Sequence, residues 1–387
     1  IAIRPDEIRE VLGIYNRHFG SVSVKTKYPR AKIPTCLQRG LALALAKVGI
    51  GGLLKYDSKE HPTWKDVLLA TSRVRLPREA KPSAGWPLPK AVFRFLLHGG
   101  FIEGVPEEIK ARSVFFALPK DNEIDALVRL SVEKGALTWE NIYGHLGVSI
   151  GKAKDTSAAR ARAAEVWRLC IPLMGYMALL RNLNNFIEAG MQDVLEVAKG
   201  LSDREKVLDA KQLPFRFLTA WKTVGQGAVN TLGQDVIARV KEYLEIAADH
   251  AVDNLPLLPG RTAVFVDNSG SMSTACVSTR SIVSLAEAGN MLGAIFFRKT
   301  ELAIVMPFGD CALDISSRLS RDMPLLCLAR EIGAHSGEHG HGTNGTACIQ
   351  SLGSQKVDRV VFLSDMQMYG HKYGDSHFGV AIEDYRR

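Results

Sequence analysis

The character of the sequence changes once along the chain, at the Pro-rich stretch NLPLLPGR (254–261). Before this stretch, segments of helical length carry amphipathic patterns and end at Gly or Pro. After it, short apolar runs rich in β-branched residues alternate with helical stretches. The sequence therefore predicts two domains, an all-helical region over 1–255 and an α/β region over 260–387.

The helical region contains many short helix candidates with no strand-like alternation between them. Such a run of helix pairs is typical of HEAT-like or armadillo solenoids, although no fixed repeat length is found. One segment, RAAEVWRLCIPLMGYMALLRNLNNFIEAG (162–190), reads as a single helical stretch. Its most apolar part, 169–180, is shorter than the ~20 residues of a membrane helix. It also contains Pro172 and Gly175, so we expect a buried helix of a bundle and no membrane partner.

Composition narrows the class of protein and of partner. The 387 residues suit two domains, and the net charge of +8 favours an anionic partner such as nucleic acid or a membrane surface. The six cysteines form no CxxC pair and several lie in apolar runs, which predicts reduced core thiols in a cytoplasmic protein. The first residues, IAIRPDEIRE, have no initiator Met and no apolar signal core, as expected for the middle of a longer chain.

Three apolar runs in the α/β region, TAVFVD (262–267), ELAIVMPF (301–308) and DRVVFLSD (358–365), have the character of buried strands. Helical stretches over 279–299 and 323–333 separate them. Strands that alternate with helices predict a parallel sheet covered on both faces. In such sheets, ligands bind at the loops beyond the carboxyl ends of the strands.

Hard oxygen ligands gather at these loops. The motif VFVDNSGSM places one carboxylate and two hydroxyls directly after the first strand, and later loops add a Thr and an Asp. Such ligands suit Mg²⁺ or Mn²⁺ better than Zn²⁺. The predicted metal ligands are Asp267, Ser269, Ser271, Thr343 (with Thr346 as the second choice) and Asp365. The alternative is a Ser-rich turn that binds no metal.

A further loop, HSGEHGHG, carries His335, His339 and His341. Histidines at this spacing are compatible with a zinc site. A solvated Gly/His loop is the simpler interpretation.

Basic residues cluster in two places in the helical region, where their charges can neutralise phosphates. The first basic cluster consists of Lys55, Lys59, Lys65, Arg73, Arg75 and Arg78. The second consists of Lys152, Lys154, Arg160 and Arg162. Arg181 stands with three asparagines on an otherwise apolar segment, LLRNLNNF, where guanidinium and amide groups suit single-stranded RNA. The alternatives are solvated basic faces and, for this segment, hydrogen bonds to neighbouring helix ends.

Two resemblances follow from these motifs. The order DNSGS, then GT, then the strand-terminal Asp365 resembles the metal-ion-dependent adhesion site (MIDAS) of von Willebrand A domains. In that family the ion recruits an acidic group of a partner or is structural. The stretches 36–77, IPLMGYMALLRNLNNF (171–186) and QLPFRFLTAW (212–221) resemble the TROVE module of the Ro autoantigen family, and its bacterial members more than the animal ones.

The Ro resemblance implies a ring of helical repeats followed by a Rossmann-like von Willebrand A module. It implies a non-catalytic RNA-binding protein that binds small structured Y-like RNAs on a basic outer face and single-stranded 3′ ends of misfolded RNA in a central hole, in RNA quality control. Lys55, Lys59 and Arg73 match the family's Y RNA-contacting positions. The family also implies an exoribonuclease as a partner, and we expect a monomer.

This chain departs from the family pattern at both ends. The resemblance implies a further N-terminal helical region, and further sheet and helix after AIEDYRR, which we expect this chain to lack. We therefore expect a fragment or a short family member.

Two other functions compete with RNA binding. A metal-dependent protein-interaction adaptor would hold an acidic partner through the ion, and its RNA affinity would be weak and insensitive to changes at Lys55 or Arg73. A metal-dependent hydrolase would need a general base near Asp267, and the neighbouring sequence offers none.

Overall fold

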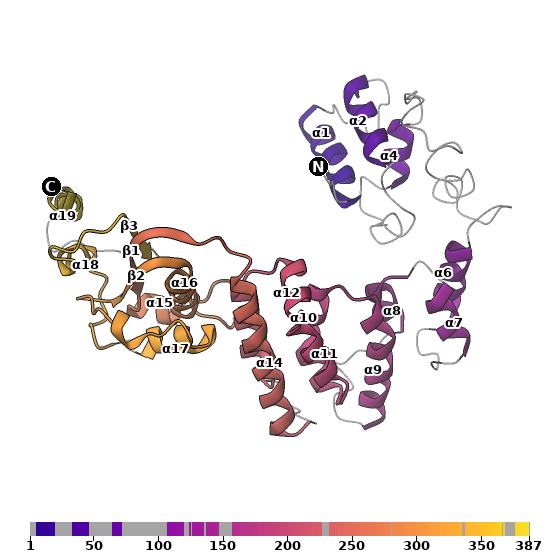
Figure 1. Ribbon diagram of the computed structural model, residues 1–387. Coiled ribbons are helices and arrows are strands. Elements are labelled where there is room, and N and C mark those ends of the chain that lie inside the picture. The colour runs from indigo at the N-terminus through magenta and orange to yellow at the C-terminus, as the bar shows by residue number, and fades with distance from the viewer. Residues whose placement is uncertain are drawn as a thin grey trace. The chain divides into compact units, whose positions relative to one another are not determined.

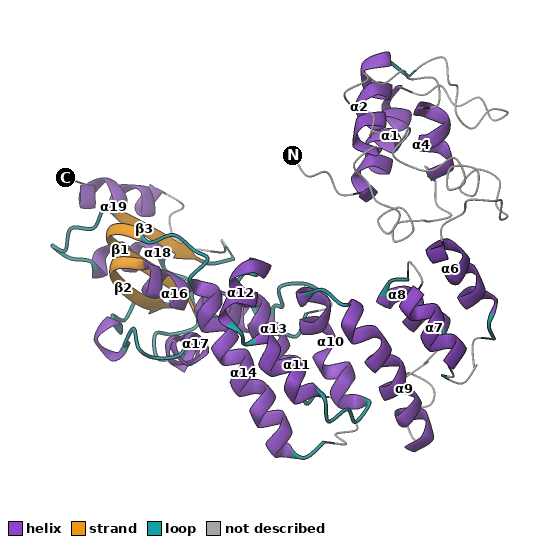
Figure 2. Cartoon of the chain, turned by 45° about the vertical axis from the view of Figure 1, so that its right-hand side comes forward, coloured by secondary structure: helices purple, strands orange, loops and turns teal. Residues whose placement is uncertain are grey.

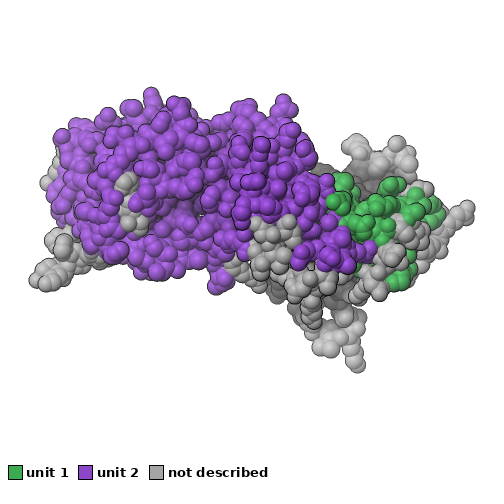
Figure 3. Space-filling model, turned by 90° about the horizontal axis from the view of Figure 1, so that it is seen from below, with its two compact units in different colours: residues 1–152, 165–173 green, residues 153–164, 174–387 purple. Residues whose placement is uncertain are grey.

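The computed structural model describes residues 5–19, 33–45, 64–71, 107–119, 124, 126–134, 137–146, 157–226, 232–279, 281–334, 337–365, 367 and 376–386. The chain forms two compact units (Figure 3). Unit 1 comprises 1–152 and 165–173, and unit 2 comprises 153–164 and 174–387. Within the described residues the chain is mostly helical and has one three-stranded parallel sheet, which agrees with the predicted order of a helical region followed by an α/β region.

Unit 1 is built from short amphipathic helices. Its elements are α1 (Pro5–Phe19), α2 (Thr35–Leu45), α4 (Trp64–Thr71), α6 (Glu107–Ala117), α7 (Ala126–Lys134), α8 (Trp139–His145), the second part of α9 (Ser157–Cys170) and the 3₁₀ turn η2 (Ile171–Leu173). The helices α1, α2 and α4 pack on one another through buried residues such as Leu12, Leu45 and Trp64. Thr138 begins α8 with a reciprocal capping box to Asn141, which satisfies two otherwise free backbone donors.

The predicted continuous helix over 162–190 is wrong. The chain leaves the α-helix after Cys170, passes through η2, and begins α10 at Tyr176. Pro172 has no backbone N–H and cannot continue an α-helix, and Gly175 serves as the N-cap of α10. The apolar run 169–180 is therefore a helix–turn–helix junction. No described helix is long and apolar enough to span a bilayer.

Unit 2 begins with a stack of helices (Figures 1 and 2). They are α10 (Tyr176–Glu188), α11 (Val194–Leu201), α12 (Arg204–Ala210), α13 (Phe215–Thr223) and α14 (Gln234–Val252). The long helix α14 contacts α11, α12 and α13, while α10 contacts α11 and α13. Apolar positions on successive turns of α14, including Val240, Leu244 and Ala248, are buried, so the amphipathic stripe of this helix faces the stack.

The sheet consists of β1 (Leu258–Asp267), β2 (Thr300–Phe308) and β3 (Arg359–Leu363), in the order β2-β1-β3. All pairs are parallel. The three predicted strands are confirmed, but β1 begins at Leu258, inside the stretch that the sequence indicated as a linker. Because Val266 lies opposite both Pro307 and Leu363, the carboxyl ends of all three strands meet at one edge.

Helices cover both faces of the sheet (Figure 1). They are α15 (Gly270–Thr274), α16 (Leu285–Lys299), α17 (Leu325–Ala334), α18 (Gly345–Ser351) and α19 (Ser376–Arg386), with a 3₁₀ turn η3 (Ser316–Arg318). On one face, Phe265 packs in a cluster with Cys348 of α18 and Tyr385 of α19. On the other, Val266 lies against Gly293 of α16. Alternate residues of β1 thus pack into the cores on opposite faces of the sheet, as expected for a buried strand.

Polar contacts join the helical stack to the sheet module within unit 2. Arg298 of α16 lies 3.2 Å from the carboxylate of Asp249 on α14, and the same carboxylate accepts the backbone N–H of Leu325 at the start of α17. These contacts explain why unit 2 spans the predicted domain boundary at 255–260. The boundary marks a change of secondary structure, and packing continues across it.

Candidate functional site

The first of the predicted metal ligands lies at the edge of the sheet where the three strands end. Asp267 is the last residue of β1 and is fully buried. Asp365 lies two residues beyond β3, the strand next to β1. Two parallel strands in register bring these two segments to the same edge of the sheet.

The Asp267 carboxylate is held by neutral donors. The backbone N–H of Ser269 donates to Oδ1 at 2.9 Å, and the Ser364 hydroxyl donates to Oδ2 at 2.6 Å. No ion pair within the described part of the chain includes Asp267. A fully buried carboxylate without a cation is costly, so its surroundings favour an added positive charge.

The two serines of the motif stand beside each other. Ser269 Oγ and Ser271 Oγ lie 3.2 Å apart, and Ser269 is almost fully buried. The motif turns directly from β1 into α15, which forces both hydroxyls and the carboxylate into one short loop. The arrangement offers three hard oxygen donors from five consecutive residues.

The loop with Thr343 lies against this first loop. The backbone N–H of Gly270 donates to the carbonyl of His341 at 3.3 Å. Thr343 is only 4% exposed. The second choice, Thr346, has a buried hydroxyl with no hydrogen-bond partner within the described residues. The hydroxyls of Thr343 and Thr346 therefore both lie on a segment that packs against the metal loop, residues 267–271.

Asp365 is half-buried, and its Oδ1 accepts the backbone N–H of Gln367 at 3.1 Å. Across the described part of the chain, this edge included, no three His, Cys, Asp or Glu side chains converge in a way that could hold a metal ion, so a site here would depend on its Ser and Thr hydroxyls. His339 and His341 thus form no such group there, and His335 lies outside the described residues. The oxygen-rich loops are the candidate metal centre that remains.

Two features of this region were missed from the sequence. Ser364, which donates to Asp267, lies in the predicted strand DRVVFLSD, one residue before the predicted ligand Asp365. A cavity of about 600 Å³ lies behind the metal loop, between α13, α16 and α17. Asn268, Trp221 and Asn290 are among the residues that line it. No local sequence signal marks this cavity, because its walls come from three distant segments.

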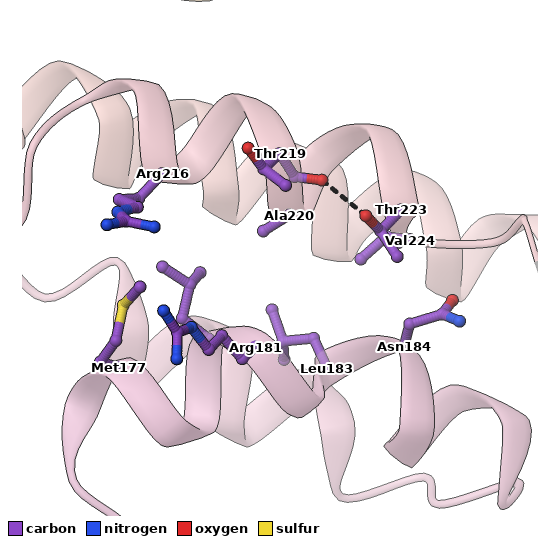
Figure 4. A pocket seen from close by; sticks show the side chains of 10 residues that line it. Met177, Arg181, Leu183, Asn184, Arg216, Thr219, Ala220, Thr223 and Val224 are labelled. Atoms are coloured by element: carbon purple, nitrogen blue, oxygen red, sulfur yellow. Dashed lines mark hydrogen bonds between the residues drawn. The ribbon is translucent and has the colours of Figure 1, made fainter. Parts of the chain in front are cut away.

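Most of the predicted RNA-binding residues lie outside the described residues. These are Lys55, Lys59, Arg73, Arg75, Arg78, Lys152 and Lys154. Lys65 lies on α4, and its side chain is also outside the description. Arg160 and Arg162 lie on the first part of α9 and are half-buried. Arg181 is exposed on α10 and faces a hollow between α10 and α13 (Figure 4).

The asparagines beside Arg181 are engaged in hydrogen bonds of the helical stack. Asn182 donates to the carbonyl of Ala178 at 2.8 Å and accepts from Asn185 at 2.8 Å. Asn184 accepts the backbone N–H of Gly225, just beyond α13, at 3.1 Å. The alternative in which these amides bond neighbouring helix ends is therefore confirmed for Asn184.

The comparisons with known proteins agree with this architecture. Residues 153–260 match a family model described as the TROVE domain. This range begins where unit 2 begins and ends inside β1, so it covers the whole helical stack. No curated protein matches the chain.

A structure described as the crystal structure of Deinococcus radiodurans RO (RSR) protein is similar to this chain, with a TM-score of 0.65 and 20% sequence identity. The likeness covers 90% of this chain and 66% of that one. At this identity the likeness concerns the fold, and the chain spans just under two thirds of that protein.

Proposed function

We propose that this chain is a member of the Ro family and acts as a non-catalytic RNA-binding protein. The TROVE match and the Ro-like fold support this proposal. The TROVE match over the helical stack is the observation that carries the proposal. The net charge of +8 supports it, because a basic surface attracts phosphates. The matching family model is not that of an enzyme.

The finer proposal follows the family pattern. The helices form a HEAT-like ring, small structured Y-like RNAs bind the first basic cluster, and single-stranded ends of misfolded RNA bind elsewhere on the helical region. The role is RNA quality control. An exoribonuclease partner and a monomeric state belong to the same proposal.

The loops at the sheet edge are proposed as a von Willebrand A metal site. Asp267, Ser269, Ser271, Thr343 and Asp365 would hold Mg²⁺ or Mn²⁺, and the bound ion would supply a Lewis-acidic position for an acidic group of a partner. The fit rests on the donor set and on Asp267, a fully buried carboxylate bonded by Ser269 and Ser364. The protein's own part is to hold these oxygens in place before the ion arrives.

A binding titration tests the RNA proposal. A structured small RNA, with and without a single-stranded 3′ tail, is titrated into the chain over a series of salt concentrations. The cluster variant replaces Lys55, Lys59 and Arg73 with Ala. A charge-matched control replaces three exposed cations, Lys206, Arg239 and Lys356, with Ala.

We expect submicromolar binding that weakens steeply with salt, because each neutralised phosphate releases counterions. The cluster variant should lose most of its affinity for the structured RNA, and the control should lose little. Weak, salt-insensitive binding that neither variant changes would contradict the proposal.

The alternative function is a metal-dependent protein-interaction adaptor. The buried charge of Asp267 favours it, because a cation bound there is suited to an acidic partner side chain. It predicts capture of acidic proteins that requires Mg²⁺ or Mn²⁺, without appreciable RNA affinity. The titration above therefore separates the two functions.

A further inference from the structure

A hollow of about 130 Å³ lies between α10 and α13, inside the TROVE-matching segment (Figure 4). Two arginines, Arg181 from α10 and Arg216 from α13, face it from opposite sides. Figure 4 shows both guanidinium groups at one end of the hollow and Asn184 at the other. The sequence indicated Arg181 alone, because Arg216 reaches the hollow only through the packing of α10 on α13.

No carboxylate among the described residues pairs with either guanidinium group. Both arginines are exposed, and neither guanidinium has an ion pair or hydrogen bond within the described residues. Arg216 lies over the ring of Phe215, at 5.1 Å, which restrains its position. Paired arginine forks match the oxygens of a phosphate group. This end of the hollow is thus suited to an anion with several oxygens.

The hydroxyls along the α13 wall present acceptors. Thr223 Oγ1 donates its hydrogen to the carbonyl of Thr219 at 2.7 Å, and Thr219 Oγ1 donates to the carbonyl of Phe215 at 3.4 Å. Since each hydroxyl has one hydrogen, its remaining lone pairs can only accept. A ligand that meets this wall must supply a donor, and the ribose 2′-hydroxyl is such a group.

The floor of the hollow is apolar. Leu180 and Leu183 lie at its base and are almost fully buried, while the half-buried Met177 and Ala220 give the hollow an apolar surface against which a sugar or base can pack. A phosphate clamp, acceptors for a hydroxyl and an apolar floor occur together within about two turns of two facing helices. A hollow of this size has no room for a duplex.

We propose that the hollow between α10 and α13 is a nucleotide site for single-stranded RNA, with the phosphate between Arg181 and Arg216 and the ribose 2′-hydroxyl at Thr223. The site rests on the proposed RNA-binding function and adds to it a location and a preference for RNA over DNA. It is separate in sequence from the first basic cluster, which is proposed for structured RNA.

The test uses the full chain and a labelled oligouridine of about ten nucleotides, a length within the span of single-strand-binding folds. The groove variant replaces Arg181 and Arg216 with Ala, and its charge-matched control replaces the exposed Lys206 and Arg239 with Ala. All four positions are exposed, so thermal unfolding should show that each variant folds. A third variant, Thr223→Val, removes the acceptor and is compared on oligouridine and its 2′-deoxy analogue.

The groove variant should bind oligouridine about tenfold more weakly, because charge-assisted hydrogen bonds to a phosphate are lost. Its salt slope should fall by about 0.7, the value for one neutralised phosphate of a single strand. The charge control should change little. Wild type should prefer oligouridine to its deoxy analogue by roughly fivefold, and Thr223→Val should remove that preference.

The possible failures are distinct. If wild type binds RNA but the groove variant and its control bind oligouridine equally well, the nucleotide site is wrong and the RNA-binding function stands. If the groove variant loses affinity for oligouridine but Thr223→Val leaves the preference for oligouridine over its deoxy analogue unchanged, the ribose contact is wrong. If wild type binds no RNA, both the site and the proposed function are wrong.

Discussion

Lys222 of α13 donates to both carboxylate oxygens of Glu287 on α16, at 2.6 and 2.5 Å. The pair joins the TROVE-matching stack to the sheet module. Glu287 also accepts from the backbone N–H and the hydroxyl of Ser284, with which it forms a reciprocal capping box at the start of α16. One carboxylate thus fixes a helix end and a junction between two structural layers.

This relationship predicts a pH-dependent stability. Burial opposes ionisation of Glu287, but hydrogen bonds from Lys222 and Ser284 outweigh it, so its pKa lies below the ordinary value of 4.5. The folded chain keeps this carboxylate charged where the unfolded chain would protonate it. The stabilisation is therefore present above pH 4.5 and is lost as the pH falls through the lowered pKa.

Glu287→Gln should lower the free energy of unfolding at neutral pH by up to about 1 kcal/mol, since Gln keeps the capping geometry but loses the charge. The difference from wild type should shrink below pH 4.5. Denaturant unfolding of both proteins at neutral pH and below pH 4.5 measures this difference in the free energy of unfolding. Glu242→Gln, at an exposed position on α14, is the control. A difference that stays constant with pH would refute the assignment.

The metal site predicts stabilisation by divalent cations. Mg²⁺ or Mn²⁺ at roughly 100 times its Kd should raise the free energy of unfolding by about 2.7 kcal/mol. Asp267→Asn should abolish this response, because it removes the one fully buried ligand charge. Asp314→Asn, which changes an exposed carboxylate of the same module, should keep it. An equal response in wild type and Asp267→Asn would exclude Asp267 as a ligand.

The contact between α16 and the sheet predicts a steric effect. A Cβ at Gly293 would lie 2.8 Å from Cγ2 of Val266. Gly293→Ala should therefore destabilise unit 2 by about 1–3 kcal/mol, despite the better helix propensity of Ala. Gly379→Ala, on α19, where no atom of the described residues lies within 4 Å of the added Cβ, should be neutral or stabilising. Thermal unfolding distinguishes the two, and equal stability of both variants would show that α16 can shift at little cost.

Thiol reactivity should follow burial. Burial, with a smaller contribution from Glu140, raises the pKa of the Cys170 thiol to about 12, and burial also raises the pKa of the Cys348 thiol. At mildly alkaline pH, iodoacetamide should modify the exposed Cys36, Cys276 and Cys311 and spare the two buried thiols until the chain unfolds. Mass spectrometry of peptides reads this directly, and early alkylation of Cys348 would contradict its burial beneath the sheet.

The strands, and the shared edge at which they end, were predictable because their signals are local. Apolar β-branched runs mark β1, β2 and β3, and parallel strands place Asp267 and Asp365 at one edge whatever the details of the helices. Long amphipathic helices such as α14 are equally local. Their periodicity alone fixes both their existence and their buried face.

The features that escaped prediction depend on contacts between distant segments. Arg216 meets Arg181 only when α13 packs on α10, and Lys222 meets Glu287 only when the stack packs on the sheet module. The break at 171–175 was signalled by Pro172 and Gly175, but the strongly apolar pattern around them masked it.

The central claim is RNA binding by two separate sites, and one set of affinities tests it most directly. Tailless structured RNA and oligouridine are each titrated into wild type, the cluster variant and the groove variant at two salt concentrations. We predict that the cluster variant loses the structured RNA and keeps oligouridine, that the groove variant does the reverse, and that both wild-type affinities weaken steeply with salt. Weak binding of both RNAs that neither salt nor either variant changes would contradict the account.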